Sequence, residues 1–124
     1  MILPLSCNQK EGSSQPQTTA SEYVNISVSE FNTEFSEPDS NTIVLDVRTD
    51  REYKAGAIPN SVQIDFMSPD FKSEVTKLDP NKTYILYCQS GGRSSAASKI
   101  MTKELGFKDV KNLEGGYATW SKSK

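Results

Sequence analysis

Residues 84–94 hold the side chains best suited to chemistry, a lone cysteine followed by a small glycine loop and an arginine. The apolar, β-rich run 84–87 predicts a buried strand that leads directly into Cys88. From Ser94 onward, apolar residues recur at helical spacing, at Ala97, Ile100, Met101 and Leu105. Gly106 follows them and predicts the end of the helix. We therefore expect Cys88 at a strand-to-helix turn, which is where parallel α/β sheets bind ligands.

Three features of this turn favour a thiolate over a thiol. The N-terminus of the following helix carries a partial positive charge, and Arg93 adds a nearby cation. Gly91 and Gly92 have no Cβ, so the backbone can curl and direct several amides at one anion. The chain contains no histidine, so the predicted chemistry is attack by a bare thiolate on sulfur or phosphorus. The alternative is that Cys88 is a small buried hydrophobic residue, which the loop, the arginine and the helix together disfavour.

Three segments in order resemble one known family. Residues 88–94, read as C-x-S-G-x-R-S, are similar to the active-site loop of rhodanese (thiosulfate sulfurtransferase) domains. Residues 43–59 resemble the D-V-R…E-Y…G-H-I-P segment of that family, and residues 113–120 its closing G-G…W segment. The resemblance covers about residues 24–122 and departs at Ala57, where the family usually has histidine, so a hydrogen bond that steadies that turn is expected to be missing.

The resemblance implies a sulfurtransferase in which Cys88 takes sulfane sulfur from a donor such as thiosulfate and holds it as a persulfide. A thiophilic acceptor, cyanide or a small or protein thiol, would then remove the sulfur. The substrate-binding residues it implies are Gln89, Ser90, Gly91, Gly92, Arg93 and Ser94. The residues expected to support the site are Asp46, Arg48, Glu52, Gly115 and Gly116. It implies no metal and no organic cofactor.

Some roles and functions stay open at this point. Arg93 either assists an anionic donor or turns outward to pair with a carboxylate, and Ser94 is either a ligand group or a hydrogen bonder at the helix start. Cysteine phosphatases place arginine six residues after the cysteine, whereas Arg93 follows Cys88 by five, so the tighter loop suits sulfur better than phosphate. The alternative from another class is a rhodanese-fold module that only binds, or that carries sulfur solely with a docked partner.

Length and patterning set the fold class. The 124 residues suffice for one domain, over residues 23–124, and a net charge of −2 does not suggest a broad nucleic-acid surface. Strand-like runs alternating with helical ones predict a three-layer α/β domain, with a mainly parallel central sheet of about five strands flanked by helices. The expected strands cover residues 24–26, 42–47, 61–64, 84–87 and 110–113. We also expect Ser29 to cap the first helix and Met67 to lie in the core.

The N-terminal residues 1–22 differ from the rest of the chain. They are polar after Cys7 and are expected to form a disordered tether. The short apolar run before Cys7 resembles the end of a bacterial lipoprotein signal, without a basic segment or a full apolar core in front of it. Lipidation of Cys7 would place the protein in the bacterial cell envelope or periplasm, with membrane anchoring only through that lipid. The alternative is a cytoplasmic protein.

Overall fold

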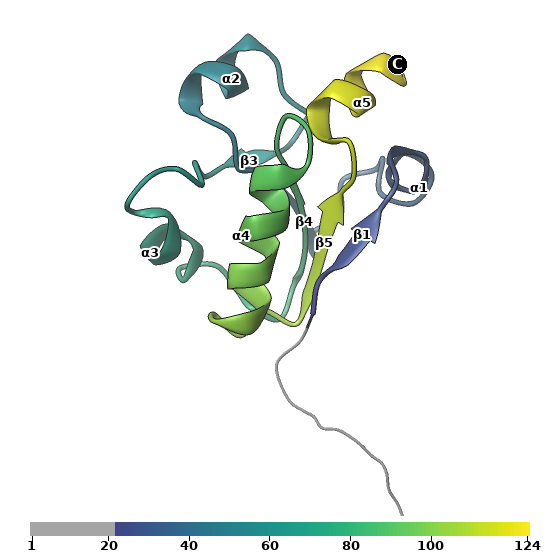
Figure 1. The fold of residues 1–124 in the computed structure, drawn as a ribbon. Coiled ribbons are helices and arrows are strands. Elements are labelled where there is room, and N and C mark those ends of the chain that lie inside the picture. The colour runs from purple at the N-terminus through teal and green to yellow at the C-terminus, as the bar shows by residue number, and fades with distance from the viewer. Residues whose placement is uncertain (1–21) are drawn as a thin grey trace, which may run out of the picture.

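Strands and helices alternate along the part of the chain that the computed structural model describes, residues 22–124 (Figure 1). In chain order they are β1 (Val24–Ile26), α1 (Val28–Glu34), β2 (Thr42–Asp46), α2 (Asp50–Ala55), β3 (Val62–Gln63), α3 (Phe71–Val75), β4 (Thr83–Tyr87), α4 (Gly92–Lys103), β5 (Asp109–Leu113) and α5 (Gly116–Lys122). The expected tether and the proposed lipidation site at Cys7 lie outside the described residues, apart from Glu22.

The strands form one five-stranded sheet in the order β1-β5-β4-β2-β3, and every pairing in it is parallel. This confirms the predicted α/β class and the parallel sheet. β4 lies at the centre, which explains why its sequence is an almost continuous apolar run. The connections after β4 and β5 leave on opposite faces of the sheet. The carboxyl ends of these two strands therefore lie where the chain direction switches from one face of the sheet to the other, which is the usual place for ligand binding in such folds.

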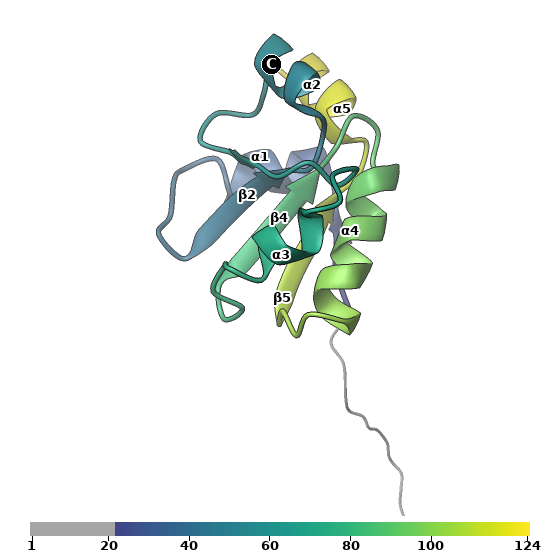
Figure 2. The same ribbon diagram turned by 90° about the vertical axis from the view of Figure 1, so that its left-hand side faces the viewer.

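Two apolar clusters hold the layers together, one on each face of the sheet. Alternate residues of β4 divide between them, because successive side chains of a strand point to opposite faces. Tyr84, Leu86 and Cys88 pack with α3 and α4, whereas Ile85 and Tyr87 pack on the side of α1 and α5. Figure 2 shows α4 along the right-hand side of the strands, α3 in front of them and α1 behind them. Cys88 therefore belongs to the α4 face.

Two predicted helix starts and one core residue need correction. The cap of α1 is Ser27 and not Ser29, because Ser27 forms a capping box in which its hydroxyl accepts from Glu30 N at 3.0 Å. Helix α4 begins at Gly92, two residues before the predicted start, because the left-handed Gly91 at its N-cap already turns the chain. Met67 is 67% exposed rather than in the core.

No helix in residues 22–124 combines the length and apolar character that a membrane span requires.

The observed strand boundaries agree with those predicted from the sequence to within one residue at each end, which is the ordinary spread between assignments of strand ends.

Candidate active site

Cys88 directly follows β4, and its side chain is 1% exposed. The backbone N–H of Gly91 donates to Cys88 Sγ across 3.1 Å, and the Ser94 hydroxyl lies 3.5 Å from the same sulfur. Gly91 has φ +113°, a conformation that residues with a Cβ rarely adopt, and it turns the chain into α4. The structure thus brings the sulfur to the N-terminal end of a twelve-residue helix, as the sequence predicted.

The surroundings of the sulfur act on its ionisation in two opposite ways. Burial is the largest influence and by itself raises the pKa of the Cys88 thiol. Hydrogen bonds from the Ser94 hydroxyl and from the amides of Ser94, Gly91 and Ser90 outweigh it, so the net pKa is lowered from its usual value. The loop is therefore built to hold a negative charge on sulfur.

Arg93 turns to a carboxylate rather than into the loop. Its guanidinium forms a two-pronged pair with Glu52 of α2, with N–O distances of 2.8 and 2.9 Å. Hydrogen bonding to Arg93 is the largest influence on Glu52 and, with bonds from Thr49, holds the pKa of its carboxyl at about 2. The pair ties α2 to the Cys88 loop, which fits the expected supporting role of Glu52.

This pair predicts a measurable dependence of stability on pH. Because the pKa of Glu52 is about 2 in the folded chain and near 4.5 without the partner, its contribution is complete above about pH 4.5 and is lost as the pH falls toward 2. We expect Glu52→Gln to remove roughly 1 to 2 kcal/mol of stability at pH 7, since both side chains are partly solvated. Urea unfolding at pH 7 and pH 3 measures this, and the difference between wild type and variant should shrink at pH 3. Arg93→Gln should behave in the same way; a loss that is independent of pH would contradict the assignment.

A buried ion pair stands behind the loop. Arg48, 2% exposed, donates to both oxygens of Asp46, 0% exposed, through Nε and Nη2, with the shortest distance at 2.7 Å. Its Nη2 also donates to Gly56 O at 2.6 Å, and its Nη1 to Gln89 Oε1 at 3.3 Å. Arg48 therefore links the end of β2 to the turn after α2 and to the Cys88 loop.

Two tyrosines complete this network, and the sequence reasoning had not assigned either to the site. Tyr87 donates its hydroxyl to Asp46 at 2.6 Å, and the ring of Tyr117 lies 4.4 Å from the Arg48 guanidinium carbon. A sequence signal existed for Tyr87, because a tyrosine within a buried strand must find a partner for its hydroxyl. Asn112 gave a similar signal, because a buried amide side chain within strand β5 also needs hydrogen-bond partners.

Gly115 and Gly116 bring the start of α5 against the Cys88 loop. The N–H of Tyr117 donates to Cys88 O at 2.8 Å, and that of Ala118 to Gln89 O at 3.0 Å. A Cβ on Gly116 would lie 2.5 Å from Cys88 O and 2.8 Å from Gln89 O, both backbone atoms that cannot move aside cheaply. The glycine is thus required for the backbone contact that supports the loop.

Replacing Gly116 tests this contact. We expect Gly116→Ala to cost more than about 2 kcal/mol, because φ of +59° is strained for alanine and the methyl group meets the loop backbone. The matched control is Gly106→Ala, where φ is +78° but nothing lies within 4 Å of the added Cβ. It should lose only the conformational part, about 1 kcal/mol. Equal losses in guanidinium unfolding would show that the contact with the loop is unimportant.

The remaining predicted site residues differ in their exposure to solvent. Gln89 and Ser90 are exposed, and Gly92 is an exposed first residue of α4 with open space around its Cα. Ser94 is buried, so it is a hydrogen bonder beneath the sulfur rather than a group that faces solvent. The structure therefore divides the predicted binding residues into an outer set and an inner one.

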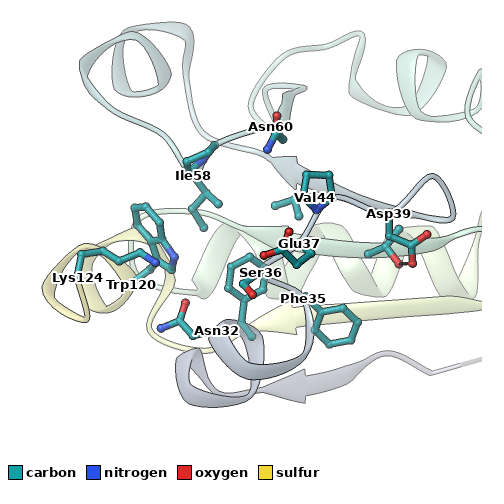
Figure 3. Close-up of a pocket in the computed structure, with 14 residues that line it drawn as sticks. Asn32, Phe35, Ser36, Glu37, Asp39, Val44, Ile58, Asn60, Trp120 and Lys124 are labelled. Carbon is teal, nitrogen blue, oxygen red and sulfur yellow. Dashed lines mark hydrogen bonds between the residues drawn. The ribbon is translucent and has the colours of Figure 1, made fainter.

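A surface pocket of about 320 Å³ lies elsewhere, on the α1 and α5 side of the sheet (Figure 3). Phe35, Val44, Ile58 and Trp120 contribute to its lining, and no residue of 88–94 does. It is therefore separate from the Cys88 loop. Within residues 22–124, no three histidine, cysteine, aspartate or glutamate side chains lie together as a metal ion would require.

Comparison with known proteins identifies the family that the sequence resembles. The family described as Rhodanese-like domain matches residues 27–123. The chain belongs to the rhodanese-like domain family. Because the family model covers residues 27–123 of the described residues 22–124, this part of the chain is a single rhodanese-like domain.

Relatives of this rhodanese-like domain include two proteins named as sulfurtransferases. The chain is 34% identical over 94 residues to the "Putative thiosulfate sulfurtransferase, mitochondrial" of Schizosaccharomyces pombe, a match that covers 67% of this chain and 66% of that protein. It is 38% identical over 84 residues to the "Putative sulfurtransferase YtwF" of Bacillus subtilis, covering 68% of this chain and 78% of the relative. The chain thus spans slightly less than two thirds of the fission yeast protein.

A solved structure shows the same fold. A rhodanese-related protein from Thermoplasma volcanium superposes with a TM-score of 0.69 at 28% identity, covering 82% of this chain and 93% of the other.

This rhodanese-like domain carries Ala57 where histidine is usual, yet two hydrogen bonds from neighbouring residues hold the turn. Ile58 N donates to Tyr87 Oη at 3.0 Å, and Gly56 O accepts from Arg48.

Proposed function

We propose that this rhodanese-like domain is a sulfurtransferase that moves sulfane sulfur through a persulfide on Cys88. The observation that carries the proposal is the Gly91 amide, which donates to Cys88 Sγ at 3.1 Å at the N-terminus of α4. Such donors stabilise a thiolate before the reaction and an anionic persulfide after it. The names of the two relatives agree with this reaction class, and one of them names thiosulfate.

The reaction has two balanced steps. The Cys88 thiolate attacks the outer sulfur of thiosulfate, an S–S bond forms, and sulfite leaves with the electron pair of the broken bond. Cyanide or a thiolate then attacks the outer sulfur of the persulfide, and Cys88 leaves as thiolate. Neither step needs a histidine base, because the attacking group is a thiolate, which has no proton to lose during the attack.

The loop residues have separate roles in this scheme. The amides of Ser90, Gly91 and Ser94, which bond to Cys88 Sγ, stabilise the transferred sulfur. The exposed Gln89 and Ser90 meet the donor. Arg93 keeps the loop in place by donating two of its N–H groups to the Glu52 carboxylate. Asp46 and Arg48 fix the strand ends behind the loop.

Mass spectrometry of the intact protein tests the two half-reactions separately. After incubation with thiosulfate, the wild type should gain the mass of one sulfur atom on Cys88, and cyanide should then remove it. A folded protein with a reduced thiol that gains no sulfur would exclude thiosulfate as donor. A gain only from a protein persulfide would instead support the alternative, a partner-dependent sulfur carrier.

A further inference from the structure

A buried polar chain runs from the Cys88 sulfur through α4 to the edge of the sheet. Ser94 is 0% exposed and Asn112 of β5 is 4% exposed. The Ser94 hydroxyl donates to Asn112 Oδ1 at 2.5 Å and lies 3.5 Å from Cys88 Sγ. The two residues therefore make a contact beneath the sulfur that no solvent interrupts.

The orientation of the Asn112 amide is fixed at its other end. Asn112 Nδ2 donates to Asn25 Oδ1 at 2.9 Å. Asn25 and Asn112 are partners in the parallel register of β1 and β5, so their side chains share one face of the sheet. Asn25 is exposed. The chain Cys88–Ser94–Asn112–Asn25 thus ends at solvent.

The Ser94 hydroxyl has one hydrogen for three neighbouring acceptors. Besides Asn112 Oδ1 and Cys88 Sγ, it lies 3.2 Å from Gly91 O. While the hydrogen points to Asn112, only a lone pair of Ser94 faces the sulfur. That arrangement suits a thiol, which can donate to Ser94, but not an anionic sulfur, which needs a donor.

We propose that Asn112 is a positioning residue that sets the direction of the Ser94 hydroxyl for each charge state of Cys88. An amide can serve both states, because it has an acceptor and a donor. With the thiol, Oδ1 accepts from Ser94, as in the structure. With a thiolate or persulfide anion, the amide turns over, Nδ2 donates to Ser94 Oγ, and the hydroxyl hydrogen points to sulfur. Asn25 can turn over as well, because it reaches solvent.

The charged groups around the sulfur do not take part in this exchange. Arg93 of α4 is paired with Glu52 of α2, and Arg48 is paired with Asp46 and reaches the loop only through Gln89. A change at Asn112 leaves all of these pairs in place, so its effect on the sulfur must pass through Ser94. The inference rests on Cys88 as the reactive thiol of the proposed function.

The test is the rate of iodoacetamide alkylation of Cys88 against pH, which reports thiolate and needs no sulfur donor. We expect Ser94→Ala and Asn112→Leu each to slow alkylation at pH 7 about three- to tenfold, the ratio for one hydrogen bond of ordinary strength. The midpoint should move to higher pH while the plateau at high pH is unchanged. In the Ser94→Ala background, Asn112→Leu should have no further effect. The matched control is Thr102→Val, which removes another buried hydroxyl of α4 and should leave the profile unchanged.

Two outcomes would overturn the inference. One is an unchanged midpoint in a folded Asn112→Leu protein, and the other is an equal slowing in both backgrounds. If Asn112→Leu does not fold, Asn25→Ala decides, because it changes only an exposed side chain. It should slow alkylation about twofold, and an unchanged rate would reject the relay. A protein that shows the expected alkylation profiles but takes no sulfur from thiosulfate would exclude thiosulfate as donor and would support this inference.

Discussion

Cys88→Ala should abolish turnover of thiosulfate and cyanide, leaving only the rate of the solution reaction. The persulfide forms on the Cys88 sulfur, and without that atom neither half-reaction has a nucleophile or a leaving group. Thiocyanate formation measures the loss, which should be on the order of a thousandfold or more. The wild type should show ping-pong kinetics, because sulfite leaves before the acceptor binds.

Two controls separate lost chemistry from a lost fold. Cys88 is buried on the α4 face, and alanine at this position removes only the sulfur atom. Because so little volume is lost, the variant should unfold near the wild-type denaturant midpoint. Lys99→Ala, an exposed change on α4 outside the Cys88 loop, should keep most of the activity. Activity retained by Cys88→Ala would reject the persulfide mechanism outright.

Asp46→Asn should produce the largest loss of stability among the site variants, about 3 to 5 kcal/mol. It leaves the Arg48 charge buried without its counterion, while Arg48 keeps only neutral acceptors at Gly56 O and Gln89 Oε1. Guanidinium unfolding should show a lower midpoint with an unchanged slope. Sulfur transfer should fall as well, because Arg48 links β2 to the Cys88 loop.

An exposed ion pair provides the matched comparison. Asp50→Asn breaks the pair with Lys54, whose side chains are 67% and 73% exposed, and should cost less than about 0.5 kcal/mol. The double change Asp46→Leu with Arg48→Met should be less harmful than Asp46→Asn, because no unpaired charge then remains. If Asp46→Asn and Asp50→Asn cost the same, the buried pair would not be a structural support.

The sequence was sufficient for the features that depend on neighbours along the chain. The apolar run before Cys88 predicted β4, and Gly91 with the apolar spacing after Ser94 predicted the turn and α4. The capping error at Ser27 and Ser29 was also local, since the pattern of Ser27 and Glu30 was readable as a capping box.

Contacts between distant segments could not be read in the same way. The pairing of Arg93 with Glu52, of Tyr87 with Asp46, and of Ser94 with Asn112 joins residues 18 to 41 positions apart. Each partner is one of several polar residues of suitable type, and only the strand order and register select among them. The exposure of Met67 was decided in the same way.

The sequence by itself therefore determined the α/β class, the family and the position of the one described cysteine at the end of a central strand. Local periodicity and glycine placement suffice for this, because they act over a few residues. Only the tertiary structure decided what surrounds that sulfur: an Arg93 paired with Glu52, a buried Asp46–Arg48 pair, the Gly116 contact and the hydrogen bond between Ser94 and Asn112. These depend on which strands become neighbours, since parallel pairing places residues far apart in the chain at one edge of the sheet.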